Sequence, residues 1–146
     1  MRRLLLSTFA VLLLAAGCTL VGGSEDGTGH AVTRATLAAK LAETQAAQDT
    51  ALALWDRIIF GETVSCQVAL PVPEAITKPV KNDTNGEAAR AQLNLAIQSV
   101  AASASLWDSE CADSRELVPL NVARSGRENA LAASTPLEQV ATLLAQ

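Results

Sequence analysis

The chain has 146 residues, of which 49% are hydrophobic, 18% charged and 3% aromatic, and this length is enough for one domain at most. Eleven lysines and arginines stand against fifteen aspartates and glutamates, so the formal charge at pH 7 is −4. An acidic chain lacks the basic field that binds a phosphate backbone, which excludes nucleic acid as a partner.

The chain begins with the pattern of a secretory signal peptide over residues 1–17. Arg2 and Arg3 supply the positive start, and the apolar run at 4–16 has the length of a signal core. This run is too short for a membrane-spanning helix, which needs about 20 apolar residues. We therefore expect export, followed by removal of the segment.

The segment LAAGC at 14–18 resembles the lipobox of bacterial lipoproteins, with alanine at position 15 where leucine is usual. The resemblance implies that Cys18 is acylated and becomes the mature N-terminus. The alternative is ordinary cleavage, which leaves Cys18 as a thiol. Because several acyl chains hold a protein durably on a bilayer, the expected location is extracytoplasmic and lipid-anchored to the membrane. Thr19 after the cysteine implies the outer membrane where the host has two membranes.

A glycine- and serine-rich tether is predicted at residues 18–30, ahead of a helical domain at 31–146. A flexible chain of about 12 residues reaches roughly 20 Å. Without residues 1–17 the chain keeps nine basic and fifteen acidic side chains, so its formal charge becomes −6. Anionic headgroups repel such a domain within a Debye length of about 8–10 Å, and we expect it to stand off the bilayer.

The first long helix is predicted at residues 31–60. No glycine or proline interrupts this stretch, and alanine, leucine, glutamine, glutamate and lysine dominate it. Steps of three and four residues predict one buried stripe. Its members are Leu37, Leu41, Thr44, Gln48, Ala51 or Leu52, Trp55, and Ile58 or Ile59.

A second long helix is predicted from residue 87 to about 111, after the Asn85-Gly86 turn. Both helices end in Leu-Trp-Asp, at 54–56 and 106–108. Duplication of one helical unit explains the match, and so does chance similarity between two alanine-rich helices.

Cys66 and Cys111 are the two cysteines left once Cys18 is acylated. An oxidising compartment favours a disulfide between them, and bridged Cα atoms lie within about 7 Å. The ends of the two long helices must then be neighbours, which predicts parallel helices joined by a return crossover. Prolines 71, 73 and 79 stiffen this crossover into extended or polyproline geometry, and residues 64–70 alternate like a short strand or extended edge.

The C-terminal part is predicted to form shorter helices. Residues 135–138, Thr-Pro-Leu-Glu, make a capping box with proline at the first helical position, which predicts a helix from 136 to about 145. Another short helix is predicted at 125–133. The expected fold is all-α, a small bundle of three to four helices in which the proline-rich crossover and the disulfide link the two long ones.

The sequence motifs do not support catalytic or cofactor chemistry. The single histidine, His30, lies at the end of the tether, where we expect a solvated linker residue. No CxxC, HExxH, CxxCH, GxSxG or SxxK motif occurs, and no phosphate-binding loop. We expect that the protein is not an enzyme and that it has neither a metal site nor a cofactor.

Four carboxylates follow the second tryptophan, at Asp108, Glu110, Asp113 and Glu116. Such a group could ligate calcium. A solvated helix end, partly neutralised by Arg115, is the simpler interpretation.

Trp55 and Trp107 lead to a more specific hypothesis, a ligand pocket. If parallel helices are bridged at their ends, both indoles lie near the disulfide, where they could wall a pocket for a hydrophobic or sugar-like ligand. The competing interpretation makes both indoles part of an alanine-rich core.

Two functions follow as expectations. The first is a non-enzymatic accessory or interaction subunit of the cell envelope, with an envelope protein or a second copy of the chain as partner. The alternative is a small-ligand-binding module that uses the Trp55/Trp107 pocket. The lipobox and the helical periodicity resemble the murein lipoprotein family, but this chain ends in Ala145-Gln146 where that family has its wall-linking lysine, so we do not expect covalent attachment to the wall.

Overall fold

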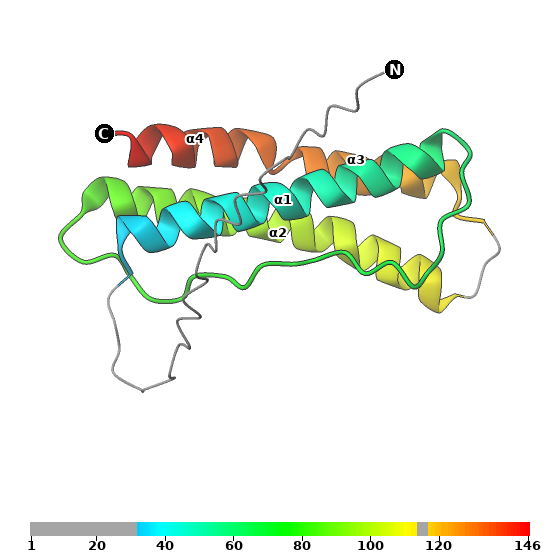
Figure 1. The fold of residues 1–146 in the computed structure, drawn as a ribbon, viewed down its shortest axis with the longest axis horizontal. Coiled ribbons are helices and arrows are strands. Elements are labelled where there is room, and N and C mark those ends of the chain that lie inside the picture. The colour runs from blue at the N-terminus through cyan, green and yellow to red at the C-terminus, as the bar shows by residue number, and fades with distance from the viewer. Residues whose placement is uncertain (1–31, 114–116) are drawn as a thin grey trace, which may run out of the picture.

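The computed structural model describes residues 32–113 and 117–146, and over these residues the chain is all-α (Figure 1). The signal peptide, the tether, Cys18 and His30 lie outside the described residues. The helices are α1 (Arg34–Ile59), α2 (Thr84–Ala112), α3 (Leu120–Leu131) and α4 (Ser134–Leu144). The predicted class, a small helical bundle with two long helices, is confirmed.

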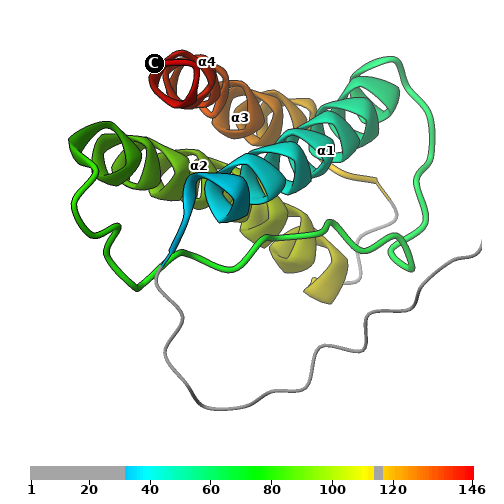
Figure 2. The ribbon, with the colours of Figure 1, turned by 60° about the vertical axis from the view of Figure 1, so that its left-hand side comes forward.

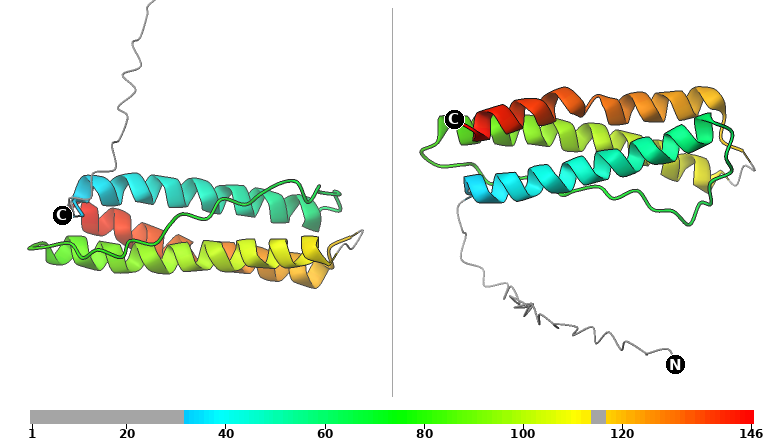
Figure 3. Two further views of the ribbon diagram at one scale, coloured as in Figure 1. Left: turned by 90° about the horizontal axis from the view of Figure 1, so that it is seen from below. Right: turned by 45° about the horizontal axis from the view of Figure 1, so that its top comes forward.

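The two long helices are parallel, as the cysteine pairing predicts. The chain leaves the end of α1, returns along the bundle as an extended crossover and enters α2 beside the start of α1 (Figures 1 and 3). The helices α3 and α4 then run back, nearly in line with each other, over the groove between α1 and α2 (Figure 2). Here α3 packs against both long helices, and α4 packs mainly against α2.

Helix α1 buries most of the stripe that its spacing predicts, while Leu41, Ile58 and Ile59 are half-buried. Thr33 caps its first turn, since the Thr36 backbone N–H donates to the Thr33 hydroxyl at 3.2 Å. The helix stops before Gly61, whose φ of +87° is a left-handed conformation that suits glycine. The buried residues are Leu37, Thr44, Ala47, Gln48, Ala51, Leu54 and Trp55.

Helix α2 begins three residues earlier than predicted. The Asp83 carboxylate caps it by accepting the Gly86 backbone N–H at 2.9 Å, so Asn85 and Gly86 belong to the first helical turn. A Cβ at position 86 would stand 2.9 Å or less from atoms of Val80 and Asp83. Close packing therefore favours glycine at this point. Of the polar turn predicted at residues 81–86, Lys81 and Asn82 do form a turn, whereas residues 84–86 belong to α2.

Arg34 holds three helix ends together. Its guanidinium donates to both Asp83 carboxylate oxygens, at 2.6 and 2.9 Å, and to the Leu144 carbonyl at 3.4 Å. These bonds join the start of α1 to the start of α2 and the end of α4. The hydrogen bond from Arg34, followed by that from Gly86, lowers the pKa of the Asp83 carboxyl to about 2.

The crossover is buried every third residue. Leu70, Pro73 and Ile76 face the bundle, which is the period of a polyproline helix with three residues per turn. The alternation predicted for residues 64–70 is wrong, because Cys66 and Val68 are exposed and only Leu70 of that set is buried.

Side chains of α2 bind the backbone of this crossover. The Ile76 N–H donates to the Asn94 carbonyl oxygen at 2.9 Å, and both Asn94 and Arg90 donate to the Ile76 carbonyl at 3.0 Å. One turn away, the Val80 N–H donates to Glu87 at 2.9 Å. The segment lacks helical or ladder hydrogen bonds of its own, and these three α2 residues pair the Ile76 amide and carbonyl and the Val80 amide.

The break between α3 and α4 depends on Gln48. Its side-chain amide donates to the Ala130 carbonyl at 2.9 Å and to the Ser134 hydroxyl at 2.8 Å, so a buried polar residue of α1 serves the groups exposed by the break. Helix α4 starts at Ser134 with no side-chain cap. The capping box predicted at residues 135–138 is therefore wrong.

The lowered pKa of Asp83 predicts acid sensitivity. A carboxyl with a folded pKa near 2 and an ordinary value of 3.8 stabilises the fold above about pH 4, and this contribution is lost as the pH falls toward 2. Asp83→Asn keeps a capping oxygen but removes the charge, so we expect its melting temperature at pH 6 to be lower than that of the parent chain. Between pH 5 and 2 the melting temperature of the variant should fall less steeply than that of the parent chain. Parallel melting curves for the exposed Glu74→Gln variant should follow the parent chain. Identical pH profiles for Asp83→Asn and the parent would refute the role of this ion pair.

Candidate functional site

Three parts of the chain meet at the end of the bundle opposite the start of α1. We call this end the distal pole and define it as residues 55–69, 104–113 and 117–128. The parallel arrangement brings the end of α1 and the end of α2 to the same place, and the chain leading into α3 returns there (Figure 1).

The predicted disulfide between Cys66 and Cys111 is present at the distal pole, with Cα atoms 5.5 Å apart. It joins the first part of the crossover to the last turn of α2. A second link lies beside it, where the Trp107 indole N–H donates to the Val68 carbonyl at 2.7 Å. Two bonds thus attach the first part of the crossover to α2, and the bond from Val80 to Glu87 attaches its last part.

The two tryptophans meet as predicted, in an edge-to-face pair with ring centroids 6.0 Å apart. Both are buried, and the Trp55 indole N–H donates to the Ser103 hydroxyl at 2.8 Å. Ser103 in turn donates to the Gly126 carbonyl at 2.9 Å, so Ser103 links the Trp55 ring to α3. Trp55 belongs to the core, and of the predicted pair only Trp107 lines the cavity described below.

Gly126 allows α3 to lie directly on the Trp55 ring. A Cβ at this position would stand 2.2 to 2.7 Å from three ring atoms, closer than any real contact. Sequence reasoning did not identify either Ser103 or Gly126. The glycine inside a helical stretch was the available signal, because such a residue often marks a close approach.

A cavity of about 270 Å³ opens between the end of α1, the first crossover residues and the chain before α3. Apolar side chains and the disulfide form much of its wall, and two glutamates and a threonine supply polar groups. The lining residues are Ile58, Gly61, Glu62, Thr63, Val64, Cys66, Trp107, Glu110, Leu117 and Val118.

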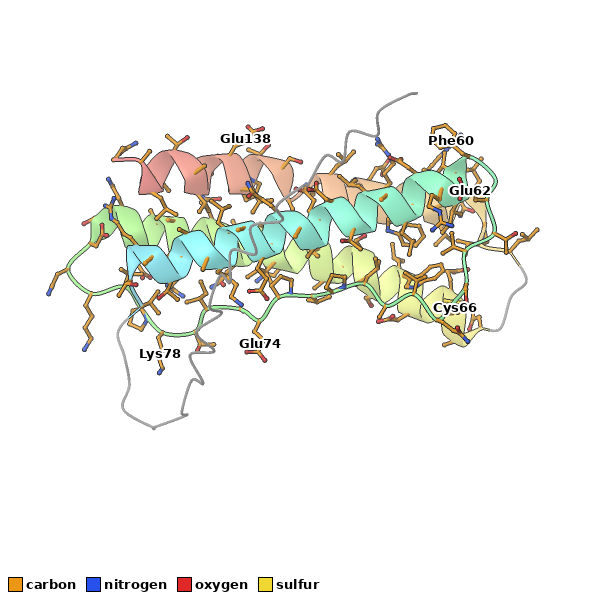
Figure 4. The ribbon with its side chains drawn as sticks, viewed as in Figure 1. Phe60, Glu62, Cys66, Glu74, Lys78 and Glu138 are labelled. Atoms are coloured by element: carbon orange, nitrogen blue, oxygen red, sulfur yellow. A yellow bond between two sulfur atoms is a disulfide. The ribbon has the colours of Figure 1, made fainter. Side chains whose placement is uncertain are left out.

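Exposed apolar side chains gather at the same pole. Seven large hydrophobic residues are exposed over the described ranges, and four of them belong to the distal pole. Phe60 is 83% exposed and Leu117 72%, while Leu120 and Val68 are exposed to a smaller degree. Figure 4 shows Phe60, Glu62 and Cys66 at this end of the molecule. Phe60 lies off the buried stripe of α1, and that offset is the sequence signal that could have identified it.

The distal pole also carries most of the net negative charge of the described residues. It holds six carboxylates and three arginines, a formal charge of −3, whereas the rest of the described domain holds six carboxylates and five lysines or arginines. Two of the arginines are bonded at the pole, Arg57 to Glu62 at 2.7 Å and Arg127 to Asp56 at 2.6 Å. Two of the three helix ends here are C-terminal and add partial negative charge.

The predicted alternative of a calcium site has no support in the geometry. Over residues 32–113 and 117–146, no three histidine, cysteine or carboxylate side chains gather closely enough to hold a metal ion. Asp108, Glu110 and Asp113 lie along the end of α2, and Glu116 lies outside the described residues.

Two further grooves flank α4. One, of about 510 Å³, lies against α2, and the other, of about 390 Å³, against α1. Polar or charged residues are five of the seven that line each groove, and none of the exposed large hydrophobic residues lines either groove. The distal pole therefore differs from both in combining a cavity with exposed apolar area.

The comparisons with known proteins indicate no function for the distal pole. No protein-family model, curated protein or solved structure matches the chain. Among the helices of the described residues, none is long and apolar enough to cross a membrane.

The packing of Trp55 on Gly126 predicts a specific loss of stability. Gly126→Ala places a methyl group inside the space of the indole ring, so we expect a loss of about 1–3 kcal/mol in the free energy of unfolding. Urea denaturation followed by tryptophan fluorescence measures it. The neighbouring exposed Ser125→Ala should stay within about 0.5 kcal/mol of the parent chain. Equal unfolding midpoints for the two variants would contradict this packing.

Removal of the disulfide is expected to lower the free energy of unfolding by more than Gly126→Ala does. The disulfide closes a loop across 45 residues, and the chain-entropy relation assigns such a loop about 4 kcal/mol. We expect the double variant Cys66→Ser and Cys111→Ser to unfold at a much lower urea concentration, and a reductant to shift the parent chain toward the variant. A parent chain whose midpoint is the same with and without reductant would show that the bond contributes nothing.

Proposed function

We propose that this protein is an extracytoplasmic lipoprotein, anchored through Cys18, and that its helical domain is a non-enzymatic interaction subunit of the cell envelope. The partner is an envelope protein that binds the distal pole. The observation that carries this proposal is the coincidence of exposed apolar side chains, a cavity and net negative charge at that pole.

The position of the pole relative to the anchor supports the proposal. The chain enters the bundle at the start of α1, and the pole lies at the other end of that helix (Figure 3). A helix of 26 residues is about 39 Å long. With a tether that reaches roughly 20 Å, the pole is presented well beyond the headgroups, where a partner can reach it.

The charge distribution supports the same orientation. The half of the domain near the tether is almost balanced in charge, and Lys78 and Lys81 lie on its crossover. The acidic half is the one that anionic headgroups repel. This distribution favours an orientation in which the nearly neutral half of the domain faces the bilayer and the distal pole faces away from it.

Apolar area and negative charge favour binding over catalysis. Monomeric proteins expose contiguous apolar patches mainly where something binds them, and the most exposed residues here are Phe60 and Leu117. A second candidate function, storage or sensing of a small apolar ligand, is favoured by one observation, the cavity beside Trp107.

Photo-crosslinking from the pole tests the proposal. A photoreactive amino acid in place of Phe60, in the full chain expressed in its own envelope, should capture one envelope protein in stoichiometric yield. Cys18→Ala, exported with a cleavable signal, should release the protein from membranes and lose the capture. Mass spectrometry of the parent chain should find an acylated N-terminal cysteine.

Two leucines of equal exposure provide the matched control. Leu120 at the pole is 47% exposed and Leu95 on the side of α2 is 48% exposed. Leu120→Ser should weaken the capture, and Leu95→Ser should leave it unchanged. A lone monomer, or a yield insensitive to Leu120→Ser, would overturn the partner proposal. A captured second copy of the chain would replace the envelope partner with self-association.

A further inference from the structure

We propose that the cavity at the distal pole receives one aromatic side chain of the partner protein, and that a lysine or arginine beside this side chain meets the acidic surround. This inference rests on the proposed function and names the chemistry of the partner. Three properties of the pole lead to it: the size and wall of the cavity, the charge around it and the apolar rim.

The size and the wall of the cavity suit an aromatic ring. An engineered cavity of about 150 Å³ holds benzene, so the 270 Å³ found here accommodates a side chain as large as phenylalanine, tyrosine or tryptophan. Trp107 and Cys66 both belong to this wall. Aromatic rings pack favourably against both an indole edge and a sulfur atom, which gives them an advantage over an aliphatic side chain.

The surround of the cavity selects for positive charge. Glu62 and Glu110 both line the cavity, within a pole whose formal charge is −3. Glu62 is bonded to Arg57 in a pair whose side chains are both about half exposed, and exposed pairs of this kind hold their geometry weakly. These carboxylates attract a cationic group that lies next to the inserted aromatic side chain, and they repel an anionic group.

The apolar rim favours a protein over a free small molecule. Leu117 belongs to the cavity wall and is also largely exposed, and Phe60 and Leu120 lie at the same pole outside the cavity. A ligand confined to the cavity would leave these side chains in water. A protein segment that inserts one residue covers them as well, which is the usual arrangement of a buried anchor within a ring of weaker contacts.

Labelled peptides test the inference directly. The protein is the full chain in nanodiscs of zwitterionic lipid, and the probes are nine-residue peptides that differ only in a central lysine–tryptophan–lysine, lysine–alanine–lysine or glutamate–tryptophan–glutamate core. By fluorescence anisotropy, we expect the first peptide to bind about tenfold more tightly than either of the others. The preference for lysine over glutamate should shrink at 1 M salt, where the Debye length is about 3 Å.

Variants of the crossover separate the two halves of the recognition. Thr63→Phe fills the mouth of the cavity from an exposed loop and should abolish the preference for tryptophan over alanine, whereas Thr77→Phe, exposed on the far part of the crossover, should preserve it. Glu62→Gln should reduce the preference for lysine over glutamate, whereas Glu74→Gln should not. Each pair compares the same substitution at two places on one segment, and Figure 4 shows the separate positions of Glu62 and Glu74.

The outcomes also distinguish this inference from the proposed function. Equal binding of the three peptides, or preference for the glutamate core, would overturn the inference, while a partner captured at position 60 would still uphold the function. Tryptamine that binds as tightly as the lysine–tryptophan–lysine peptide would overturn the choice of a protein segment, because the rim would then contribute nothing. Selective peptide binding without any captured partner would count against the proposed function alone.

Discussion

The fold depends on one constraint: two long helices run in the same direction and their far ends are linked by the bond between Cys66 and Cys111. A chain that finishes one such helix must travel the whole length of the bundle before it can begin the next. This return segment has no helix or sheet to pair its backbone. Glu87, Arg90 and Asn94, which stand three and four residues apart on α2, instead pair the Ile76 amide and carbonyl and the Val80 amide. The crossover is therefore part of the packed structure, and α2 has one side for the bundle and another for the crossover.

Much of this architecture follows from the sequence. The long helices are evident from the absence of glycine and proline and from the spacing of apolar residues, since both properties act locally. The parallel arrangement follows from the pairing expected between Cys66 and Cys111. The details that could not be predicted are those in which distant residues compete with a local pattern. Asp83 captures Gly86 and extends α2 through an apparent turn, and Gln48 of α1 replaces the capping box expected before α4.

The candidate site was predictable only in part, for a related reason. The sequence places Trp55 and Trp107 at matching positions, and the structure brings them together, but it gives them different surroundings. Trp55 is covered by Gly126, which lies on a helix that no local pattern connects to it, and Trp107 remains beside a cavity. The exposure of Leu117 could not be predicted from the local sequence either, because a single leucine near Pro119 has no periodic neighbours that indicate which way it faces. Surfaces are set by what tertiary packing leaves uncovered, and a one-dimensional pattern contains that information only for regular elements.

The continuity of α1 has a mechanical consequence. If the domain is anchored and bound as proposed above, α1 joins the end of the bundle where the chain enters to the distal pole, and a pull between bilayer and partner acts along the axis of this helix. The disulfide passes part of that load from the end of α1 to α2, and Arg34 connects the two helices again at the other end. Parallel rods clamped at both ends and loaded lengthwise must slide past each other before they separate, which shears many side-chain contacts together. Resistance to such a pull is governed by the rate of unfolding, and this arrangement suits a domain held between a membrane and a moving partner.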